Sequence, residues 1–116
     1  MILMVDRSAQ LVALANDYRN RIWEERSLGS ADRVSAWNLQ DYRLAEAHIS
    51  IVCGAPSVRL SLRELNEAGK ELGRVWRTDA SKEPEVEAAW RRHREALGSF
   101  IESSADYIAA MGKRAV

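Results

Sequence analysis

Asp41 and His93 are the residues of this sequence whose types could perform general acid–base catalysis. A carboxylate beside an imidazole favours the charged imidazole and can exchange a proton with it. Both residues fall on otherwise apolar faces of predicted helices, and a rise of about 1.5 Å per residue places them at nearly the same depth in a helical bundle. The alternative is a structural hydrogen bond that fixes helix register, which we prefer because the sequence places no nucleophile or third catalytic group beside them. We therefore predict a buried polar pair and no enzymatic activity.

The histidines lack the spacing of a metal site. A di-iron bundle needs paired Glu-x-x-His motifs, whereas Ala45 and Trp90 stand three residues before His48 and His93. Cys53 is the only cysteine, which excludes an intramolecular disulfide and a cysteine zinc cluster and favours the reducing cytoplasm. No glycine-rich turn followed by Lys-Ser or Lys-Thr precedes a predicted helix. The sequence predicts neither a metal nor a cofactor.

Four tryptophans form the main candidate site. Each falls in a different predicted helix. Trp23 and Trp76 lie near the ends of their helices, and Trp37 and Trp90 lie near the starts of theirs. Because short loops make consecutive helices antiparallel, we expect all four at one end of the fold. They form either an aromatic core layer or a partly open cup for a ligand or partner residue. Trp23 is expected to be the most exposed, since it is offset by one residue from the apolar stripe of its helix.

A basic cluster adjoins the expected tryptophan end and could attract a phosphate or an acidic partner. It contains Arg74, Arg77, Arg91, Arg92 and Arg94. Several glutamates are interspersed with it, so a solvated face of ion pairs is the preferred interpretation. The candidate binding end comprises Trp23, Trp37, Trp76, Trp90, Arg91, His93 and Arg94.

Three breaks in the apolar pattern, at 28–30, 54–56 and 78–84, divide the chain into four predicted helices. These helices span 6–27, 31–53, 56–77 and 84–113, with apolar residues recurring at spacings of three and four. Ser30 is expected to cap the second helix, Gly54 to end it in a left-handed conformation, and Pro56 to begin the third. The expected fold is all-α, an antiparallel up-down-up-down four-helix bundle that forms a single domain over 1–116. The apolar residues 1–5 are too few to span a membrane and are expected to be an arm that packs on the bundle or on a partner.

The composition favours one soluble globular domain. The chain has 116 residues, of which 47% are hydrophobic and 29% charged. Lys and Arg total 17 and Asp and Glu total 17, so no global positive field would draw the chain to nucleic acid. No specific nucleic-acid partner is therefore expected.

Two segments carry a resemblance to known proteins. The stretch from Ala45 to Val58, with a helix break at Gly54-Ala55-Pro56, and the later stretch from Arg94 to Ile101 resemble small helical-bundle proteins of unknown function that are common in actinobacteria and their phages. Many of those proteins carry an N-terminal membrane anchor, which is not expected here because the first helix begins almost at once. The resemblance implies a helical bundle and no catalytic residue.

The breadth of the apolar face of the second helix indicates the function. Leu39, Leu44 and Ile51 extend beyond a narrow core seam, and large exposed apolar patches mark association surfaces. We expect a non-enzymatic protein-interaction module that forms a homodimer. The alternative is a small-ligand-binding regulator that uses the tryptophan end, with polar contacts from Arg91 or Arg94 and from His93. Nucleic-acid binding ranks next and an enzyme last.

Overall fold

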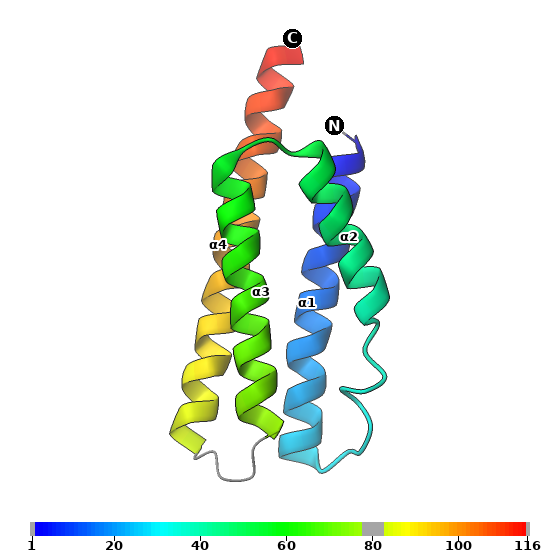
Figure 1. Ribbon diagram of the computed structural model, residues 1–116, viewed down its shortest axis with the longest axis vertical. Coiled ribbons are helices and arrows are strands. Elements are labelled where there is room, and N and C mark those ends of the chain that lie inside the picture. Colours follow the sequence, from blue (N-terminus) through cyan, green and yellow to red (C-terminus); the bar gives the residue numbers. More distant parts are fainter. Residues whose placement is uncertain (1, 78–82, 116) are drawn as a thin grey trace. The chain divides into compact units, whose positions relative to one another are not determined.

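The computed structural model describes residues 2–77 and 83–115, which form four α-helices. They are α1 (Ile2–Leu28), α2 (Leu39–Val52), α3 (Pro56–Arg77) and α4 (Glu83–Ala115) (Figure 1). The described residues contain no strand, so the predicted all-α class is confirmed. Met1 and the expected connection at 78–82 lie outside the described residues.

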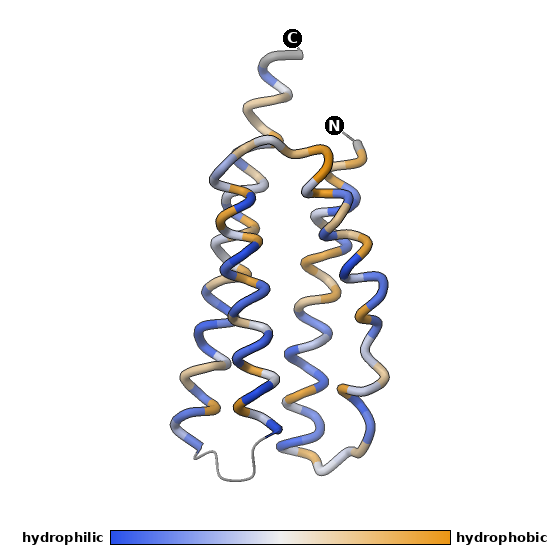
Figure 2. Tube along the Cα trace, in the orientation of Figure 1, coloured by the Kyte–Doolittle hydropathy of each residue, from blue (hydrophilic) through white to orange (hydrophobic). Residues whose placement is uncertain are grey.

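The helices pair as two hairpins, and each hairpin is a compact unit. The first hairpin covers residues 2–52 and packs α2 against α1, and the second begins at Cys53 and packs α3 against α4 (Figure 1). Apolar and polar residues are interspersed along every described helix (Figure 2). The sequence-based expectation that one bundle contains all four helices stays a prediction.

α1 is longer than predicted at its N-terminal end. It begins at Ile2, so residues 2–5 of the segment expected to be an apolar arm form the first turn of the helix. The helix ends at Leu28 and is followed by Gly29, whose φ of +69° is left-handed. Glycine adopts this conformation without the steric cost of a Cβ atom, which makes it a common residue just after a helix.

α2 begins at Leu39, later than the predicted start at residue 31, and Ser30 does not cap it. The N-cap is Asn38, whose Oδ1 accepts a hydrogen bond from the main-chain amide of Asp41 at 3.0 Å. Its Nδ2 in turn donates to Oδ2 of Asp41 at 2.7 Å. An N-cap acceptor satisfies one of the free amides of the first turn, and an acidic residue there interacts favourably with the helix dipole.

Side chains of α1 explain why residues 31–38 do not continue the helix. Glu25 accepts a hydrogen bond from the amide of Val34 at 2.7 Å, and Arg21 donates to the carbonyl of Arg33 at 2.8 Å. Asp32 adopts a positive φ of 61°, which a short polar side chain tolerates better than a bulky one. These tertiary bonds hold the backbone in turns, and the local sequence pattern cannot reveal them.

α3 has the predicted bounds, with Pro56 in its first turn, and α4 extends the predicted 84–113 slightly at both ends. α2 ends at Val52, but Gly54 does not adopt the expected left-handed conformation. Instead, the side chain of Arg59 reaches back, and its Nε donates to the carbonyl of Cys53 at 3.0 Å. The break between α2 and α3 is therefore stabilised by a side chain of α3.

α3 and α4 run antiparallel. Ser57 at the start of α3 lies near Tyr107 late in α4, whereas Gly69 in the middle of α3 lies near His93 early in α4. A methyl group at Gly69 would lie 3.8 Å from both Cδ2 and Nε2 of His93, an ordinary contact. Gly69 therefore faces an imidazole, and no neighbouring backbone approaches it closely.

Candidate functional site

Trp37 lies in the connection between α1 and α2 and not, as predicted, in a helix. Its indole Nε1 donates a hydrogen bond to the main-chain carbonyl of Leu14 at 2.8 Å. The ring centroid lies 4.6 Å from that of Tyr18 and 5.3 Å from that of Tyr42. Tilted aromatic pairs at such distances stabilise a fold beyond simple burial. Trp37 thus fastens the connection to α1, a structural role that needs no ligand.

The structure also places Trp37 away from Trp23. Leu14, which accepts the indole hydrogen bond, precedes Trp23 by nine residues of α1, or about 13 Å along the helix axis. The physical reason is the late start of α2, because the chain returns along α1 as turns before it becomes helical. The expected meeting of these two tryptophans at the end of their hairpin is therefore wrong.

The other three tryptophans agree better with expectation. Trp23 is 49% exposed on α1, whereas Trp37, Trp76 and Trp90 are of intermediate exposure, so Trp23 is the most exposed of the four, as predicted. Trp76 lies at the end of α3 and Trp90 near the start of α4, and both therefore occupy the same end of the second hairpin. A site that unites Trp23 with this pair stays a prediction.

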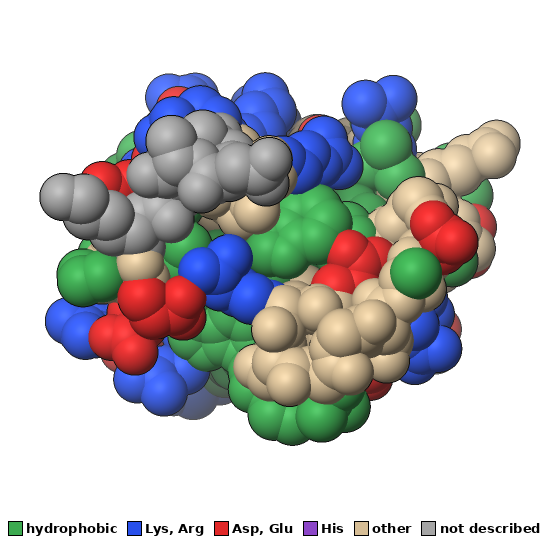
Figure 3. Space-filling view, turned by 90° about the horizontal axis from the view of Figure 1, so that it is seen from below, with side chains coloured by type: hydrophobic (Ala, Val, Ile, Leu, Met, Phe, Trp, Pro, Cys, Tyr) green, Lys and Arg blue, Asp and Glu red, His purple; other side chains and the backbone are tan. Residues whose placement is uncertain are grey.

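The arginines around Trp90 are solvent-exposed, and the neighbouring Arg74 is paired. Nη2 of Arg74 lies 2.6 Å from Oε1 of Glu71, and its Nε donates to Oε2 at 3.0 Å. The hydrogen bond from Arg74 holds the pKa of Glu71 below its usual range, and the charge of Arg92 contributes. Arg91 and Arg94 are both exposed, and basic and acidic side chains occur together on the face of the molecule seen in Figure 3. Arg74 and Glu71 form an ion pair, and a wider face of ion pairs around Arg91 and Arg94 stays a prediction.

His93 and Asp41, the predicted polar pair, belong to different hairpins. His93 is only 2% exposed and packs beside Gly69. The carboxylate of Asp41 accepts a hydrogen bond from Asn38 at the start of α2. Asp41 therefore has a local structural role, and its pairing with His93 stays a prediction.

Tyr42 is a further group with acid–base chemistry that sequence reasoning did not select. Burial raises the pKa of its phenol far above the ordinary value, and the negative charge of Glu46 raises it further. Removing a proton would create a second anion beside Glu46 in a poorly solvated place. Tyr42 therefore keeps its proton at neutral pH.

Three buried side-chain atoms of the first hairpin lack a hydrogen-bond partner among the described residues: Nε of Arg7, Oγ of Ser8 and Nδ1 of His48. A buried polar atom without a partner costs roughly 1–3 kcal/mol. No group of three or more His, Cys, Asp or Glu side chains that could hold a metal ion occurs in residues 2–77 and 83–115.

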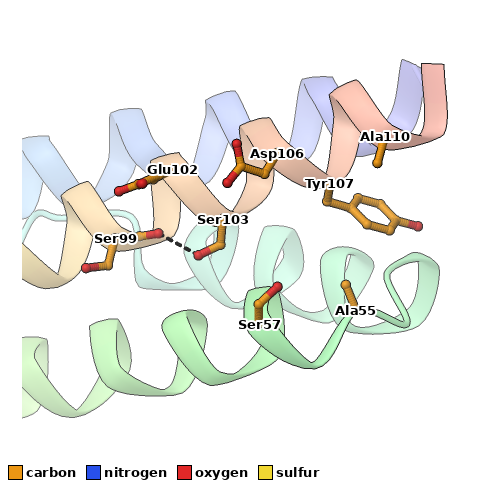
Figure 4. Close-up of a pocket in the computed structure, with 8 residues that line it drawn as sticks. All are labelled: Ala55, Ser57, Ser99, Glu102, Ser103, Asp106, Tyr107 and Ala110. Atoms are coloured by element: carbon orange, nitrogen blue, oxygen red, sulfur yellow. Dashed lines mark hydrogen bonds between the residues drawn. The ribbon is translucent and has the colours of Figure 1, made fainter. Parts of the chain in front are cut away.

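An open groove of about 480 Å³ lies between the start of α3 and the late part of α4 (Figure 4). Ser57 faces it from α3, and a polar row faces it from α4: Ser99, Glu102, Ser103, Asp106 and Tyr107. Oγ of Ser103 donates to the main-chain carbonyl of Ser99 at 2.6 Å, so this hydroxyl is occupied within its own helix. Glu102 and Asp106 are exposed to solvent. The groove thus lacks the enclosed, convergent polar groups that orient a bound small molecule.

The outer face of α2 exposes large aliphatic side chains to solvent. We define this face as Gln40, Arg43, Leu44, Ala47, Ser50 and Ile51, all of which are exposed. Leu44 is 49% and Ile51 79% exposed, although both are large aliphatic side chains. The inner side of the same helix buries Ala45 and Ile49. α2 is therefore apolar on both sides, as the breadth of its predicted apolar face indicated.

Comparison with protein-family models, curated proteins and solved structures gives no match for this chain. The resemblance to actinobacterial and phage proteins therefore stays a prediction. Among the described helices, none combines the length and the hydropathy needed to cross a membrane.

Proposed function

We propose that this chain is a non-enzymatic helical protein-interaction module that associates with itself. In this proposal the helices form an antiparallel up-down-up-down four-helix bundle, and the partner is a second copy of the chain. The single thiol of Cys53 fits a reducing cytoplasm, and the balance of acidic and basic residues gives no reason to expect a nucleic-acid partner.

The observation that carries the proposal is the exposure of aliphatic side chains on α2. Leu39, Leu44 and Ile51 expose much of their surface to water, and Val52 extends the exposed apolar surface at the end of the helix. Single exposed hydrophobic residues are ordinary, but a group of them on one short helix is typical of an association surface. Burying each such side chain contributes up to roughly 1.5–3 kcal/mol, which favours association.

Light scattering on the purified protein across a dilution series tests this proposal. We expect the mass of a dimer at high concentration and dissociation on dilution, because association follows mass action. A strictly monomeric mass at the highest attainable concentration would refute self-association.

A small-ligand-binding regulator is the second candidate, supported by the exposure of Trp23. Trp76 and Trp90 would supply further aromatic surface, and Arg91 or Arg94 could neutralise an anionic ligand. His93 is too deeply buried to meet a ligand without displacement of its neighbours. Tryptophan emission during titration with inorganic phosphate tests the anion-binding form of this candidate, and an unchanged spectrum would exclude it.

A further inference from the structure

The outer face of α2 differs in composition from the exposed side of α3, the next helix along the chain. Exposed residues of α3 are mostly charged: Arg59, Arg63, Glu64, Glu67, Lys70, Arg74 and Arg77. Among the exposed residues of α2, Arg43 alone is charged. Charged residues are depleted in the centre of protein interfaces, so α2 has the composition of an interface and α3 that of a solvated surface.

The apolar residues of this face form a narrow stripe. Leu44, Ala47 and Ile51 follow each other at spacings of three and four, which places them within about 60° of arc on the helix. Ala47 lies between the two large side chains and is itself exposed. A small residue at the centre lets a second helix approach to the usual axial separation of about 8–10 Å.

The stripe is complementary to itself when two copies run antiparallel. A two-fold axis midway between Leu44 and Ile51 brings Leu44 of one copy opposite Ile51 of the other, and the reverse contact follows by symmetry. The axis then passes beside Ala47, where the small side chain leaves room for the crossing. The dimer therefore contains two Leu44–Ile51 contacts, and they bury the large apolar side chains of both copies.

Charge selects the antiparallel direction over the parallel one. A parallel pair would place the two Arg43 guanidinium groups side by side, and like charges repel. The antiparallel pair places each Arg43 at the level of Val52 of the partner, where α2 ends. The last carbonyls of a helix carry partial negative charge and attract a cation. Arg43, which flanks the apolar stripe, therefore favours the antiparallel orientation.

We infer that two copies of this chain associate through antiparallel pairing of their α2 helices, with Ala47 at the two-fold axis and Arg43 against the C-terminal end of the partner's α2. This inference rests on the proposed self-association and names the surface that performs it. The second copy is a better occupant than an unrelated partner because the stripe and its flanking charge complement themselves.

Disulfide trapping tests the alignment directly. In a Cys53→Ala background, which removes the native thiol, one variant carries Ala47→Cys and the other Gln40→Cys. A disulfide needs Cα atoms about 4.4–6.8 Å apart. In the proposed pair the two copies of residue 47 are adjacent, whereas the two copies of residue 40 are separated by about 22 Å along the helices. With oxidised glutathione as the oxidant, we expect a covalent dimer for Ala47→Cys and none for Gln40→Cys.

The other results separate this inference from the proposed function. Dimers from both variants would indicate parallel helices and overturn the alignment. If neither variant forms a covalent dimer but light scattering still shows a dimer, the interface lies elsewhere on the chain, and only the proposed self-association remains. Absence of both with a monomeric mass at all concentrations would refute both proposals.

A second pair of variants uses no thiol chemistry. Ile51→Lys places a positive charge in the stripe beside the partner's Arg43, and Leu60→Lys makes the same change at a leucine of α3 that is 53% exposed. We expect Ile51→Lys to weaken dimerisation roughly tenfold or more, since it brings a like charge close to Arg43 at a buried position, while Leu60→Lys leaves the dissociation constant unchanged. Circular dichroism checks that both variants fold. Equal effects of the two variants, or no effect of Ile51→Lys, would overturn the inference.

Discussion

Replacing Trp37 by phenylalanine tests whether this indole fastens the connection between α1 and α2. The change removes the hydrogen bond from Nε1 to the carbonyl of Leu14 and reduces the aromatic surface that packs near Tyr18 and Tyr42. The carbonyl itself remains within the hydrogen-bond ladder of α1, so the variant creates no buried unpaired group. The loss is therefore the net value of a hydrogen bond, about 1 kcal/mol, plus about 1 kcal/mol for the smaller ring.

We therefore expect Trp37→Phe to lower the free energy of unfolding by about 2 kcal/mol. Trp23→Phe is the matched control, because the same chemical change at a half-exposed position should cost less than about 0.5 kcal/mol. Urea unfolding is best followed by circular dichroism at 222 nm, since both variants alter the tryptophan signal. Equal midpoints for the two variants, with equal slopes, would refute the structural role assigned to Trp37.

Three further predictions concern a helix cap, the glycines and a buried phenol. Asn38→Ala should lower the free energy of unfolding by about 1 kcal/mol, whereas Ser30→Ala should leave it nearly unchanged; equal costs in urea unfolding would contradict the position of the cap. Gly69→Ala should stabilise the chain by roughly 0.5–1 kcal/mol, because an added methyl group makes only ordinary contacts within a helix. Gly29→Ala should destabilise it by roughly 1 kcal/mol, because its φ is +69°; thermal unfolding that shifts both midpoints in the same direction would count against these assignments. Because the pKa of the Tyr42 phenol is raised in the folded chain, the unfolded chain releases this proton at a lower pH. The contribution of Tyr42 to the free energy of unfolding is therefore complete below the ordinary pKa of 10.0 and decreases as the pH rises above it. Tyr42→Phe should therefore reduce the loss of helical signal between about pH 10 and 12, and an unaltered alkaline profile would show that this phenol is not responsible.

Helix positions were predictable where local signals agreed with one another. Pro56 supplies a suitable first turn, and the apolar spacing of α3 is regular, so its bounds follow from the sequence alone. α4 was similarly clear. For both helices the forces that decide the structure act between residues a few positions apart.

The candidate site was less predictable because its geometry depends on residues far apart in the chain. Ser30 was a plausible N-cap by type, but Asn38 is the residue that caps α2. The intervening turns are held by Arg21 and Glu25 of α1, and no local pattern reports such bonds. Because α2 begins only at Leu39, Trp37 lies in the connection before the helix and away from Trp23.

The sequence by itself determined the all-α class, the two regular helices α3 and α4, and the presence of surplus apolar residues on α2. These properties follow from the periodicity of side chains along a helix, which is local. The sequence also predicted that Leu39, Leu44 and Ile51 extend beyond the core seam, and their exposure agrees with that prediction. Only the tertiary structure decided where α2 begins and what Trp37 binds. Both depend on hydrogen bonds that join the residues before α2 to α1, and these bonds link positions far apart in the chain.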